Sequence, residues 1–315
     1  MAKIKAVTVD PEATGRLTIS EVEEPAATHS EALVKVEAIS LNRGEVRRAG
    51  MSEAGWRPGW DLAGTVLEAA ADGTGPAKGA RVVGFKGEGA WAEVVAVPTH
   101  SLAELPDNVS FAQAATLPVA GLTALYSLEM GGLLLDRQVL ITGASGGVGL
   151  FAVELARLAG ARVIGAVSKA AHAATVKEAG AEDVVVGEDL SQAGKFGKYN
   201  LILESVGGKS LTTALSLLAA DGKCVLFGAS GGGEATLDVR SFFNAGGASL
   251  YGFILFHEVK TRPAGQGLAR LARLVGDGKL HPRIDVEAPW TQVGEVANKL
   301  INREFTGKAV LHLKE

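Results

Sequence analysis

The sequence predicts two domains: a β-rich domain built from both ends of the chain, and a doubly wound α/β domain in the middle. Three observations support this fold class. A length of 315 residues suggests about two domains, each large enough for its own core. Residues 1–117 contain short apolar runs separated by Gly, Pro and Asp, as in β-structure. From there to residue 256 helical and strand-like patterns alternate, as in a doubly wound parallel sheet.

The predicted elements follow the chain in that order. The first domain contains the strand-like runs LVKVEAISL, GTVLEAA and AEVVAVP. Six strand-like segments joined by helices follow in the middle domain: QVLIT, ARVIGAV, DVVV, YNLILES, GKCVLFG and SLYGFIL. The tail holds the helix GLARLARLVGDGKL, an amphipathic stretch through VANKLINREF and a last strand, KAVLHL, which we expect to return to the first domain. The expected boundaries are 1–117 with 257–315 for the first domain, and 118–256 for the second.

A glycine-rich turn between VLIT and the helix FAVELARLAG has the spacing of a dinucleotide-binding fingerprint. Gly146 would let the backbone approach a pyrophosphate, and Gly149 would let the helix pack closely on the strand. The phosphates would then face free N–H groups at the positive end of the helix. Ala144 stands where the strict G-x-G-x-x-G motif has its first glycine, so an unrelated strand–turn–helix is the alternative interpretation.

Composition excludes several classes of partner and site. A formal net charge of −4 and the lack of a basic, aromatic-studded stretch disfavour nucleic acid or an anionic membrane as a partner. One cysteine, Cys224 in the apolar run KCVLFG, excludes an internal disulfide and predicts a buried, inert thiol. No apolar run reaches membrane-spanning length, and Met1–Asp10 alternates like a strand rather than a signal peptide. We therefore expect a cytoplasmic protein.

Several motifs in their order resemble one family nearly end to end. They include SLNRGEVRRAG, PGWDLAGTV, GARVVGF, GAWAEVVAVP, ATLPVAGLTAL, VLITGASGGVG, LILESVGG, LVGDGKL and GKAVL. Together they resemble the medium-chain dehydrogenase/reductase superfamily, in its zinc-independent NADPH:quinone oxidoreductase (zeta-crystallin-like) branch. The resemblance implies a GroES-like catalytic domain, a Rossmann dinucleotide-binding domain and a cleft between them. It also implies a homodimer, with the strand SLYGFIL as the expected dimer edge.

The residues after the second strand of the middle domain bear on the choice of cofactor. An NAD-selective site would carry Asp or Glu there, whereas this chain has Ser168 and Lys169, which suit a 2′-phosphate. The resemblance likewise implies NADPH. His172 replaces a phosphate-binding lysine of many relatives, and Gly187 replaces an aromatic residue or histidine. We therefore expect a modest NADPH preference that is stronger at low pH. The alternative for Lys169 is a solvated lysine at a helix start.

The sequence predicts no metal site. Zinc-dependent alcohol dehydrogenases of the superfamily need a cysteine, a histidine and a further cysteine or acid around an open zinc. Here no cysteine precedes Cys224, and Pro58-Gly59-Trp60-Asp61 stands where those enzymes carry glycine, histidine and glutamate. Without a Lewis acid, hydride addition to an electron-poor acceptor is more feasible than oxidation of a plain alcohol. We therefore expect hydride transfer from NADPH to a small-molecule quinone or α,β-unsaturated carbonyl compound.

By resemblance, Asn42 in SLNRGE is the catalytic candidate, positioning or polarising through its amide; the alternative is an Asx turn that ends a strand. Arg43, Glu45 and Arg47 follow in the same loop, where we expect a solvated charged turn; the alternative is that they line the cleft. Asp61 is expected to be structural. The resemblance assigns cofactor contacts to Thr123, Gly143, Ser145, Gly146, Gly147, Val148, Gly149, Ser168, Lys169, His172, Ser205, Val206, Phe227, Gly228, Ala229, Gly252, Phe253 and Ile254.

The proton donor and the physiological acceptor stay open at this stage. Tyr126 and Tyr251 are available as donors, and water is the alternative. An enoyl-thioester or biosynthetic enone reductase would use the same hydride geometry with a longer acceptor. A non-catalytic NADPH-binding protein is the competing class of function.

Overall fold

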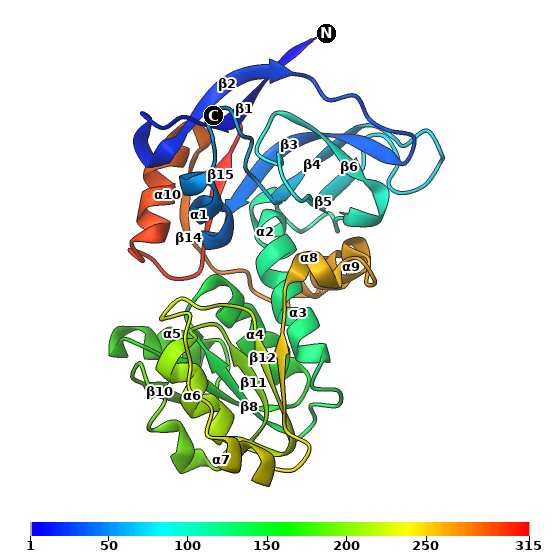
Figure 1. Ribbon diagram of the computed structural model, residues 1–315. Helices are drawn as coiled ribbons and strands as arrows, with labels where there is room; N and C mark the ends of the chain where they lie inside the picture. The colour runs from blue at the N-terminus through cyan, green and yellow to red at the C-terminus, as the bar shows by residue number, and fades with distance from the viewer. Residues whose placement is uncertain (1, 315) are drawn as a thin grey trace. The chain divides into compact units, whose positions relative to one another are not determined.

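The computed structural model describes residues 2–314 and divides into two compact units (Figure 1). Unit 1 comprises Met1–Leu122 and Val259–Glu315, and unit 2 comprises Thr123–Glu258. The chain thus leaves unit 1 for unit 2 and then returns. Both boundaries lie a few residues after the predicted ones. No helix among the described residues is long and apolar enough to cross a bilayer.

Unit 1 contains a seven-stranded sheet and a separate two-stranded ribbon, β1 with β2. The sheet order is β14-β15-β3-β4-β5-β7, and β6 pairs with β3 off this path. The last strand pairs antiparallel with β3, with Ala309 opposite Leu41, which confirms its predicted return to the first domain. The strands are β1 (Lys3–Val9), β2 (Leu17–Glu23), β3 (Glu31–Leu41), β4 (Asp61–Glu68), β5 (Arg81–Phe85), β6 (Val94–Pro98), β7 (Leu102–Glu104), β14 (Ile284–Pro289) and β15 (Lys308–His312).

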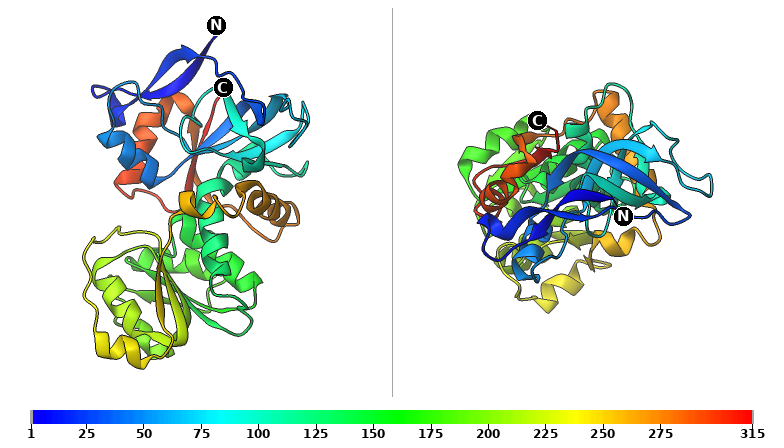
Figure 2. Two further views of the ribbon diagram at one scale, coloured as in Figure 1. Left: turned by 45° about the vertical axis from the view of Figure 1, so that its right-hand side comes forward. Right: turned by 90° about the horizontal axis from the view of Figure 1, so that it is seen from above.

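The helices of unit 1 are α1 (Arg43–Met51), which packs on α10, and three that pack on strands: α2 (Phe111–Ala115), α9 (Ala264–Gly276) and α10 (Val293–Ile301). α9 contacts β5 and β7 and buries Leu268, Leu271 and Val275 at helical spacing. The core of this unit contains the fully buried Trp91. Figure 2 gives two further views of these layers.

The helical segment that precedes the glycine-rich turn is not continuous. α2 is followed by a π-helical turn over Leu117–Gly121 and then by α3 (Leu122–Glu129). Pro118 lies at the start of that turn, where it lacks the N–H that would continue the preceding helix. The boundary between the units falls at the start of α3.

Unit 2 is a six-stranded, wholly parallel sheet in the order β10-β9-β8-β11-β12-β13. In chain order this is 3-2-1-4-5-6, the strand order of a Rossmann fold, so the predicted fold class is confirmed. The strands are β8 (Gln138–Thr142), β9 (Arg162–Val167), β10 (Asp183–Val186), β11 (Tyr199–Glu204), β12 (Leu218–Leu226) and β13 (Ser249–Gly252). Besides α3, the helices are α4 (Gly147–Leu158), α5 (Ala173–Glu178), α6 (Gly208–Ser216), α7 (Val239–Asn244) and α8 (Leu255–Glu258).

The core of unit 2 confirms the prediction for its single cysteine. Cys224 lies in β12, is completely buried and packs in one cluster with Leu140 and Ile202. Burial raises the pKa of its thiol far above the usual range, and the charge of Glu204 adds to this effect. The thiol is therefore protonated and inert, as an apolar strand position predicts.

Candidate active site

β8 and β11 are neighbours in the sheet of unit 2, although β9 and β10 lie between them in the chain. The strand order reverses at this point, and open α/β sheets bind ligands outside the carboxyl ends of strands at such a reversal. The glycine-rich turn follows β8, and Ser205 and Val206 follow β11. The topology therefore brings the predicted phosphate turn and the predicted ribose contacts to one place.

The glycines of this turn have different physical reasons to be glycine. Gly143 adopts a left-handed conformation (φ +58°), and a β-carbon there would lie 2.6 Å from Ser205 Oγ. A β-carbon at Gly149 would lie 2.3 Å from the Gly143 carbonyl oxygen, so only glycine allows α4 to pack this closely. A β-carbon at Gly146 would meet only the Gly143 carbonyl oxygen, at 3.3 Å. Gly146 thus leaves its backbone open to a ligand, as the fingerprint requires.

The start of α4 supplies free backbone donors beside that open backbone. The helix has 12 residues and begins at Gly147. The N–H groups of Gly147, Val148 and Gly149 lie in its first turn, where no preceding helical carbonyl can accept from them. Donors and the positive end of the helix dipole together fit the pyrophosphate of a dinucleotide.

The predicted 2′-phosphate residues lie beside this turn. Ser168 and Lys169 follow β9 directly and are exposed. His172 is half-buried, and its Nδ1 lies 3.4 Å from Ser145 Oγ. The structure therefore brings His172 to the phosphate turn, although the two residues belong to different loops. Gly187, which follows β10, has a φ of +146° and offers no side chain.

Six further predicted contacts follow β12 and β13: Phe227, Gly228, Ala229, Gly252, Phe253 and Ile254. A β-carbon at Gly228 would lie 2.7 Å from the Ser205 carbonyl oxygen, so the loops after β11 and β12 pack tightly. The Phe253 side chain is buried, whereas Ile254 is 63% exposed. Thr123, the first residue of unit 2, is buried.

Glu204, at the end of β11, anchors these loops, and the sequence analysis missed it. Its carboxylate is completely buried and accepts hydrogen bonds from the Val206 and Gly207 N–H groups (2.9 and 3.0 Å) and from Ser210 Oγ (3.0 Å). Its second oxygen accepts from Thr142 Oγ1 at 3.0 Å, which ties β11 to the start of the glycine-rich turn. A single acidic side chain therefore fixes both loops at the switch point.

The charge of Glu204 follows from these donors. Burial raises the pKa of its carboxyl above the usual value, and the hydrogen bonds from Val206, Gly207, Ser210 and Thr142 offset this only in part. All four partners donate, which favours the ionised form. A signal for this role exists in the sequence, because an acid that ends the buried run LILE needs partners of its own.

In unit 1, Asn42 lies between β3 and α1, and its amide belongs to a buried cluster. Asn42 Nδ2 donates to Asp61 Oδ2 (2.7 Å) and to Glu45 Oε1 (3.0 Å), and Asn42 Oδ1 accepts from Lys308 Nζ (2.6 Å). Carboxylates only accept and an ammonium group only donates, so these partners fix the orientation of the amide. Both N–H donors of Asn42 are therefore engaged within the protein.

The remaining bonds of the cluster are internal as well. Lys308 Nζ lies 3.0 Å from the Leu41 carbonyl oxygen and 3.4 Å from Asp61 Oδ2, and the two side chains are 4% and 0% exposed. Asp61 Oδ1 accepts from the Val119 N–H (3.0 Å), and Glu45 Oε1 accepts from the Asn42 N–H (2.7 Å). Glu45 Oε2 is buried without a hydrogen-bond partner among residues 2–314.

Two carboxyls and one ammonium group thus share a site without solvent. Burial raises the pKa of Glu45 far above its usual range, and the charge of Asp61 adds to this effect. Burial also raises the pKa of Asp61, but Lys308 and the donors at Asn42 and Val119 oppose it. Burial lowers the pKa of Lys308, opposed by the charge of Asp61. We assign the charged pair to Asp61 and Lys308, and the neutral acid to Glu45.

The expected solvated turn after Asn42 is wrong. Residues 43–51 form α1, and Glu45, Val46 and Ala49 are buried on one side of it. Asn42 precedes the helix and Glu45 is its third residue, so the Asn-x-x-Glu spacing of a capping box was the signal. The run of charged residues hid this pattern. Asp61 is part of the buried framework, in line with a structural role.

The donor set around Asn42 does not suit zinc. Asp61 and Asn42 already bind an ammonium group of the protein, and Trp60 stands where a histidine ligand would be needed. No group of three or more His, Cys, Asp or Glu in the described part of the chain is arranged to hold a metal ion. Lys308 supplies the positive charge in this cluster.

Comparison with known proteins agrees with these two folds. Residues 28–107 match the family of alcohol dehydrogenase GroES-like domains, and residues 147–270 match the family of zinc-binding dehydrogenases. A chloroplast envelope quinone oxidoreductase homolog of Arabidopsis thaliana is 30% identical over 313 residues, which cover 92% of each chain. This chain belongs to the quinone oxidoreductase branch of the medium-chain dehydrogenase/reductase superfamily. The predicted family is confirmed.

Other members of the family add detail. A mycobacterial protein solved in complex with NADPH is 28% identical, with a TM-score of 0.86 over 98% of this chain and 99% of that chain. The erythronolide synthase EryA2 of Saccharopolyspora erythraea is 35% identical over 66% of this chain and 6% of its own length. The NADPH complex of the mycobacterial relative and the match to the dehydrogenase family support a nicotinamide cofactor for this chain.

A change at Gly146 separates cofactor binding from folding. We expect Gly146→Val to weaken nicotinamide dinucleotide binding by about 100-fold, because its β-carbon meets only the Gly143 carbonyl oxygen, at 3.3 Å, while the side chain would occupy the space proposed for the pyrophosphate. Fluorescence titration with NADPH and thermal unfolding measure the two effects. As a control, Gly149→Ala should instead lower the free energy of unfolding by about 1–3 kcal/mol, because its β-carbon clashes with the turn. Unchanged affinity in Gly146→Val would contradict the fingerprint.

The neutral state of Glu45 gives stability a pH dependence. A raised folded-state pKa stabilises the fold below the unfolded value of about 4.3, and this stabilisation is lost as pH rises toward the folded pKa. The side chain in Glu45→Gln cannot ionise, so we compare this variant with the wild type. Above the unfolded-state pKa, the free energy of unfolding of the variant should rise relative to that of the wild type by up to about 1.4 kcal/mol per pH unit. Urea unfolding from pH 5 to 8 measures this, with the exposed Glu53→Gln as the control. Parallel curves for wild type and Glu45→Gln would refute the assignment.

Proposed function

We propose that this protein transfers hydride from NADPH to a quinone or an α,β-unsaturated carbonyl compound without a metal ion. The main support for this proposal is the cluster around Asn42. Its cation is the Lys308 ammonium group, and Asp61 forms an ion pair with that group. A site with no Lewis acid suits acceptors that are already electron-poor. The names of the quinone oxidoreductase relatives support this acceptor class.

The residues of unit 2 would bind and orient the cofactor. The backbone around Gly146 and the first turn of α4 would hold the pyrophosphate, and the loop fixed by Glu204 would border the adenosine ribose. When bound, the reduced nicotinamide supplies the hydride. Ser168, Lys169 and His172 would hold a 2′-phosphate, which supports NADPH, and the NADPH complex of the mycobacterial relative is consistent with this choice.

Asn42 is the proposed catalytic residue of unit 1, in a narrower role than its sequence motif suggests. Its N–H donors bind Asp61 and Glu45, so it has no free donor for an oxyanion that develops on the acceptor. We propose that Asn42 acts through its position, because its amide oxygen and its backbone are held in a fixed place at the reacting centre. The Tyr251 hydroxyl donates to Glu258 Oε1 at 2.7 Å, and Tyr126 is buried, so water is the proposed source of the proton.

The decisive experiment is NADPH oxidation, followed by absorbance, with a panel of quinones, alkenals and enoyl thioesters. We expect turnover of quinones or alkenals. Tight NADPH binding without turnover of any acceptor would favour a non-catalytic NADPH-binding protein. Selective turnover of enoyl thioesters would favour the second candidate, an enoyl-thioester or biosynthetic enone reductase, which the match to a polyketide synthase supports.

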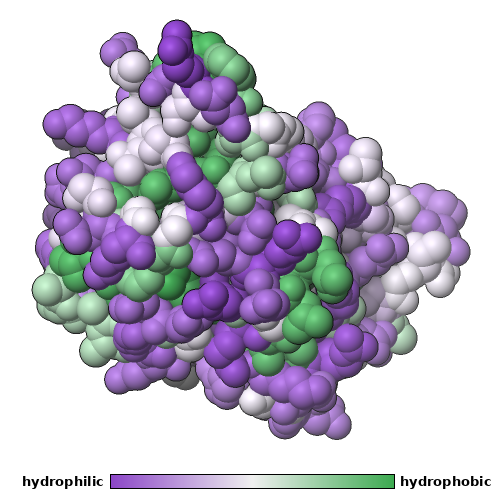
Figure 3. Space-filling view, turned by 90° about the horizontal axis from the view of Figure 1, so that it is seen from below, coloured by the Kyte–Doolittle hydropathy of each residue, from purple (hydrophilic) through white to green (hydrophobic). Residues whose placement is uncertain are grey.

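We also propose a cytoplasmic homodimer formed at the edge of unit 2. β13 is an edge strand, so one side of its backbone is available for pairing. Exposed apolar side chains gather in the same stretch of chain: Leu237, Val239, Phe243, Leu250 and Ile254. Figure 3 shows one face of the molecule, where hydrophobic side chains lie in separate areas of a hydrophilic surface. Sedimentation equilibrium tests this proposal, and a monomer at micromolar concentration would contradict it.

Cofactor selectivity should depend on the loop after β9. We expect Lys169→Ala and His172→Ala each to raise the KM for NADPH by about 10-fold, the value of one charge-assisted contact, and to leave the KM for NADH unchanged. His172→Lys should lower the KM for NADPH. Lys209→Ala, an exposed lysine on α6, is the matched control. Equal KM values for both cofactors in the wild type would remove the NADPH assignment.

Asn42→Ala should lower kcat by about 10- to 100-fold while the dissociation constant for NADPH changes less than about twofold. The reason is that the substitution frees Lys308 and the two carboxyls from their common partner and so loosens the reacting centre. Steady-state kinetics and a cofactor titration give the two values, and thermal unfolding reports the cost to the fold. Asn302→Ala, at an exposed position of unit 1, is the control. Full activity of Asn42→Ala would make Asn42 a purely structural residue.

A further inference from the structure

α1 carries arginines that the proposed hydride transfer does not use. Arg43 is the first residue of α1 and follows Asn42 directly, and Arg47 lies one turn later on the same side. Arg43 is half-buried, and its Nε is fully removed from solvent without a hydrogen-bond partner in the described range 2–314. A guanidinium nitrogen in that state has lost its water and gained nothing in return.

The neighbouring charges make the position of Arg43 more unfavourable. Burial lowers the pKa of Arg43, and the positive charges of Arg303 and Arg47 lower it further. Three cationic side chains therefore lie close together. Glu45, the acid on the same helix, is buried and directed to the Asn42 amide, so it does not neutralise them.

Arg48 shows how an arginine of the same helix is normally satisfied. Its guanidinium lies 3.5 Å from Glu88 and 4.8 Å from the ring centroid of Trp56. Its charge therefore has both an acidic and an aromatic partner. Arg43, five residues earlier in the sequence, has neither among the contacts found in the described chain.

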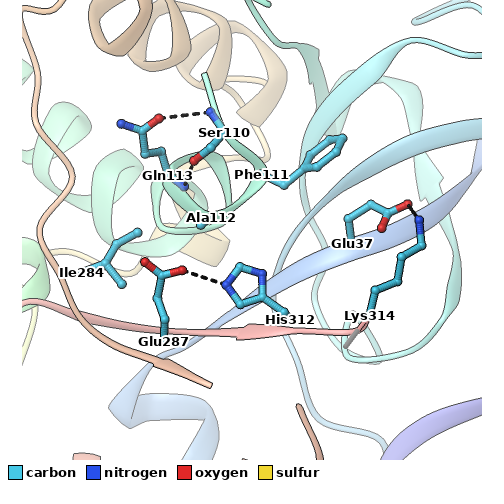
Figure 4. Close-up of a pocket in the computed structure, with 9 residues that line it drawn as sticks. All are labelled: Glu37, Ser110, Phe111, Ala112, Gln113, Ile284, Glu287, His312 and Lys314. Carbon is cyan, nitrogen blue, oxygen red and sulfur yellow. Dashed lines mark hydrogen bonds and ion pairs between the residues drawn. The ribbon is translucent and has the colours of Figure 1, made fainter. Parts of the chain in front are cut away.

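The open groove of unit 1 in Figure 4 offers a second comparison with Arg43. It has a volume of about 670 Å³. His312 pairs with Glu287 across 2.7 Å, and Lys314 pairs with Glu37 across 3.0 Å. Both basic side chains that line the groove thus have a carboxylate partner. In contrast, Arg43 Nε is buried without a partner in the described residues. The Nε atoms of Arg16 and Arg57 share this state, but Arg43 is the one that follows Asn42 directly.

We propose that Arg43, assisted by Arg47, binds an anionic group of the hydride acceptor. The acceptor is then a conjugated carbonyl compound that carries a carboxylate or a phosphate. A guanidinium group can donate two parallel hydrogen bonds to either anion, which would give Arg43 Nε its missing partner. The inference rests on the proposed function, because it takes Asn42, the residue next to Arg43, to mark the reacting centre.

Matched acceptors test the anionic group. One pair is (E)-4-oxo-4-phenylbut-2-enoate and its methyl ester; the other is crotonyl-coenzyme A and crotonyl-pantetheine, which lacks the nucleotide phosphates. We expect the wild type to prefer one anionic member by about 30-fold in kcat/KM, the value of a hydrogen-bonded charge. The first pair reports a carboxylate and the second a phosphate.

Variants assign that preference to α1. Arg43→Gln should lower kcat/KM for the preferred anion by about 30-fold and leave its neutral partner unchanged. Arg43→Lys keeps the positive charge but cannot donate two parallel hydrogen bonds, so kcat/KM for the preferred anion should fall less than in Arg43→Gln. Arg48→Gln, on the same helix, should change neither member of the pair. Equal kcat/KM within both pairs, or an equal loss for both members in Arg43→Gln, would overturn the proposal.

A binding measurement separates this proposal from the proposed function. Calorimetry with the NADPH-saturated protein and the saturated acid 4-oxo-4-phenylbutanoate, or free coenzyme A, should show binding that Arg43→Gln removes. If quinones are reduced but neither anion binds, the anion site fails and the proposed function stands. If no acceptor is reduced but Arg43-dependent binding is found, the proposed function fails and the anion site stands. If neither is observed, both are wrong.

Discussion

The buried pair of Asp61 and Lys308 is the constraint on which the organisation of unit 1 depends. Lys308 begins β15, Asp61 begins β4, and β3 lies between these strands in the sheet. An unpaired charge at either position would be strongly destabilising, since both side chains have almost no solvent contact. The pair therefore requires the chain to return from unit 2 and place its last strand beside β3. A discontinuous domain is held together by the same charges that orient Asn42.

Unit 2 uses a related solution with a different partner. Glu204 is buried beneath the loops after β8 and β11, but its charge is met by backbone N–H groups and hydroxyls rather than by a cation. Hydrogen-bond donors around a fixed anion determine the shape of a loop, because each donor must point inward. The glycines then let the same loops pack at backbone distance, as at Gly149. In each unit a buried carboxylate thus accepts hydrogen bonds from the residues proposed to bind or react: Glu204 in unit 2 and Asp61 in unit 1.

The separation along the chain between interacting residues explains which features the sequence predicts and which it does not. The individual strands, the helices and the glycine-rich turn of unit 2 depend on neighbours within each strand–turn–helix, so local spacing was sufficient to predict them. Lys308 lies 266 residues from Asn42 in the chain, and no local pattern connects them. Its role depends on which strand pairs with β3. The charged run after Asn42 was misjudged for another reason: charge suggested solvent, although the capping pattern around Glu45 indicated a helix.

The cation of this buried cluster is a lysine of the protein, which affects what the site can discriminate. A metal ion binds the oxygen of an acceptor directly, so it selects for that oxygen. Lys308 is fully engaged with Asp61, Asn42 and a backbone carbonyl, so its charge is internal and contributes little to selection. Selection must then come from groups that still lack partners. In unit 1 the half-buried guanidinium of Arg43 is such a group, which is why the charge of the acceptor, rather than the affinity of its carbonyl for a metal, should govern specificity.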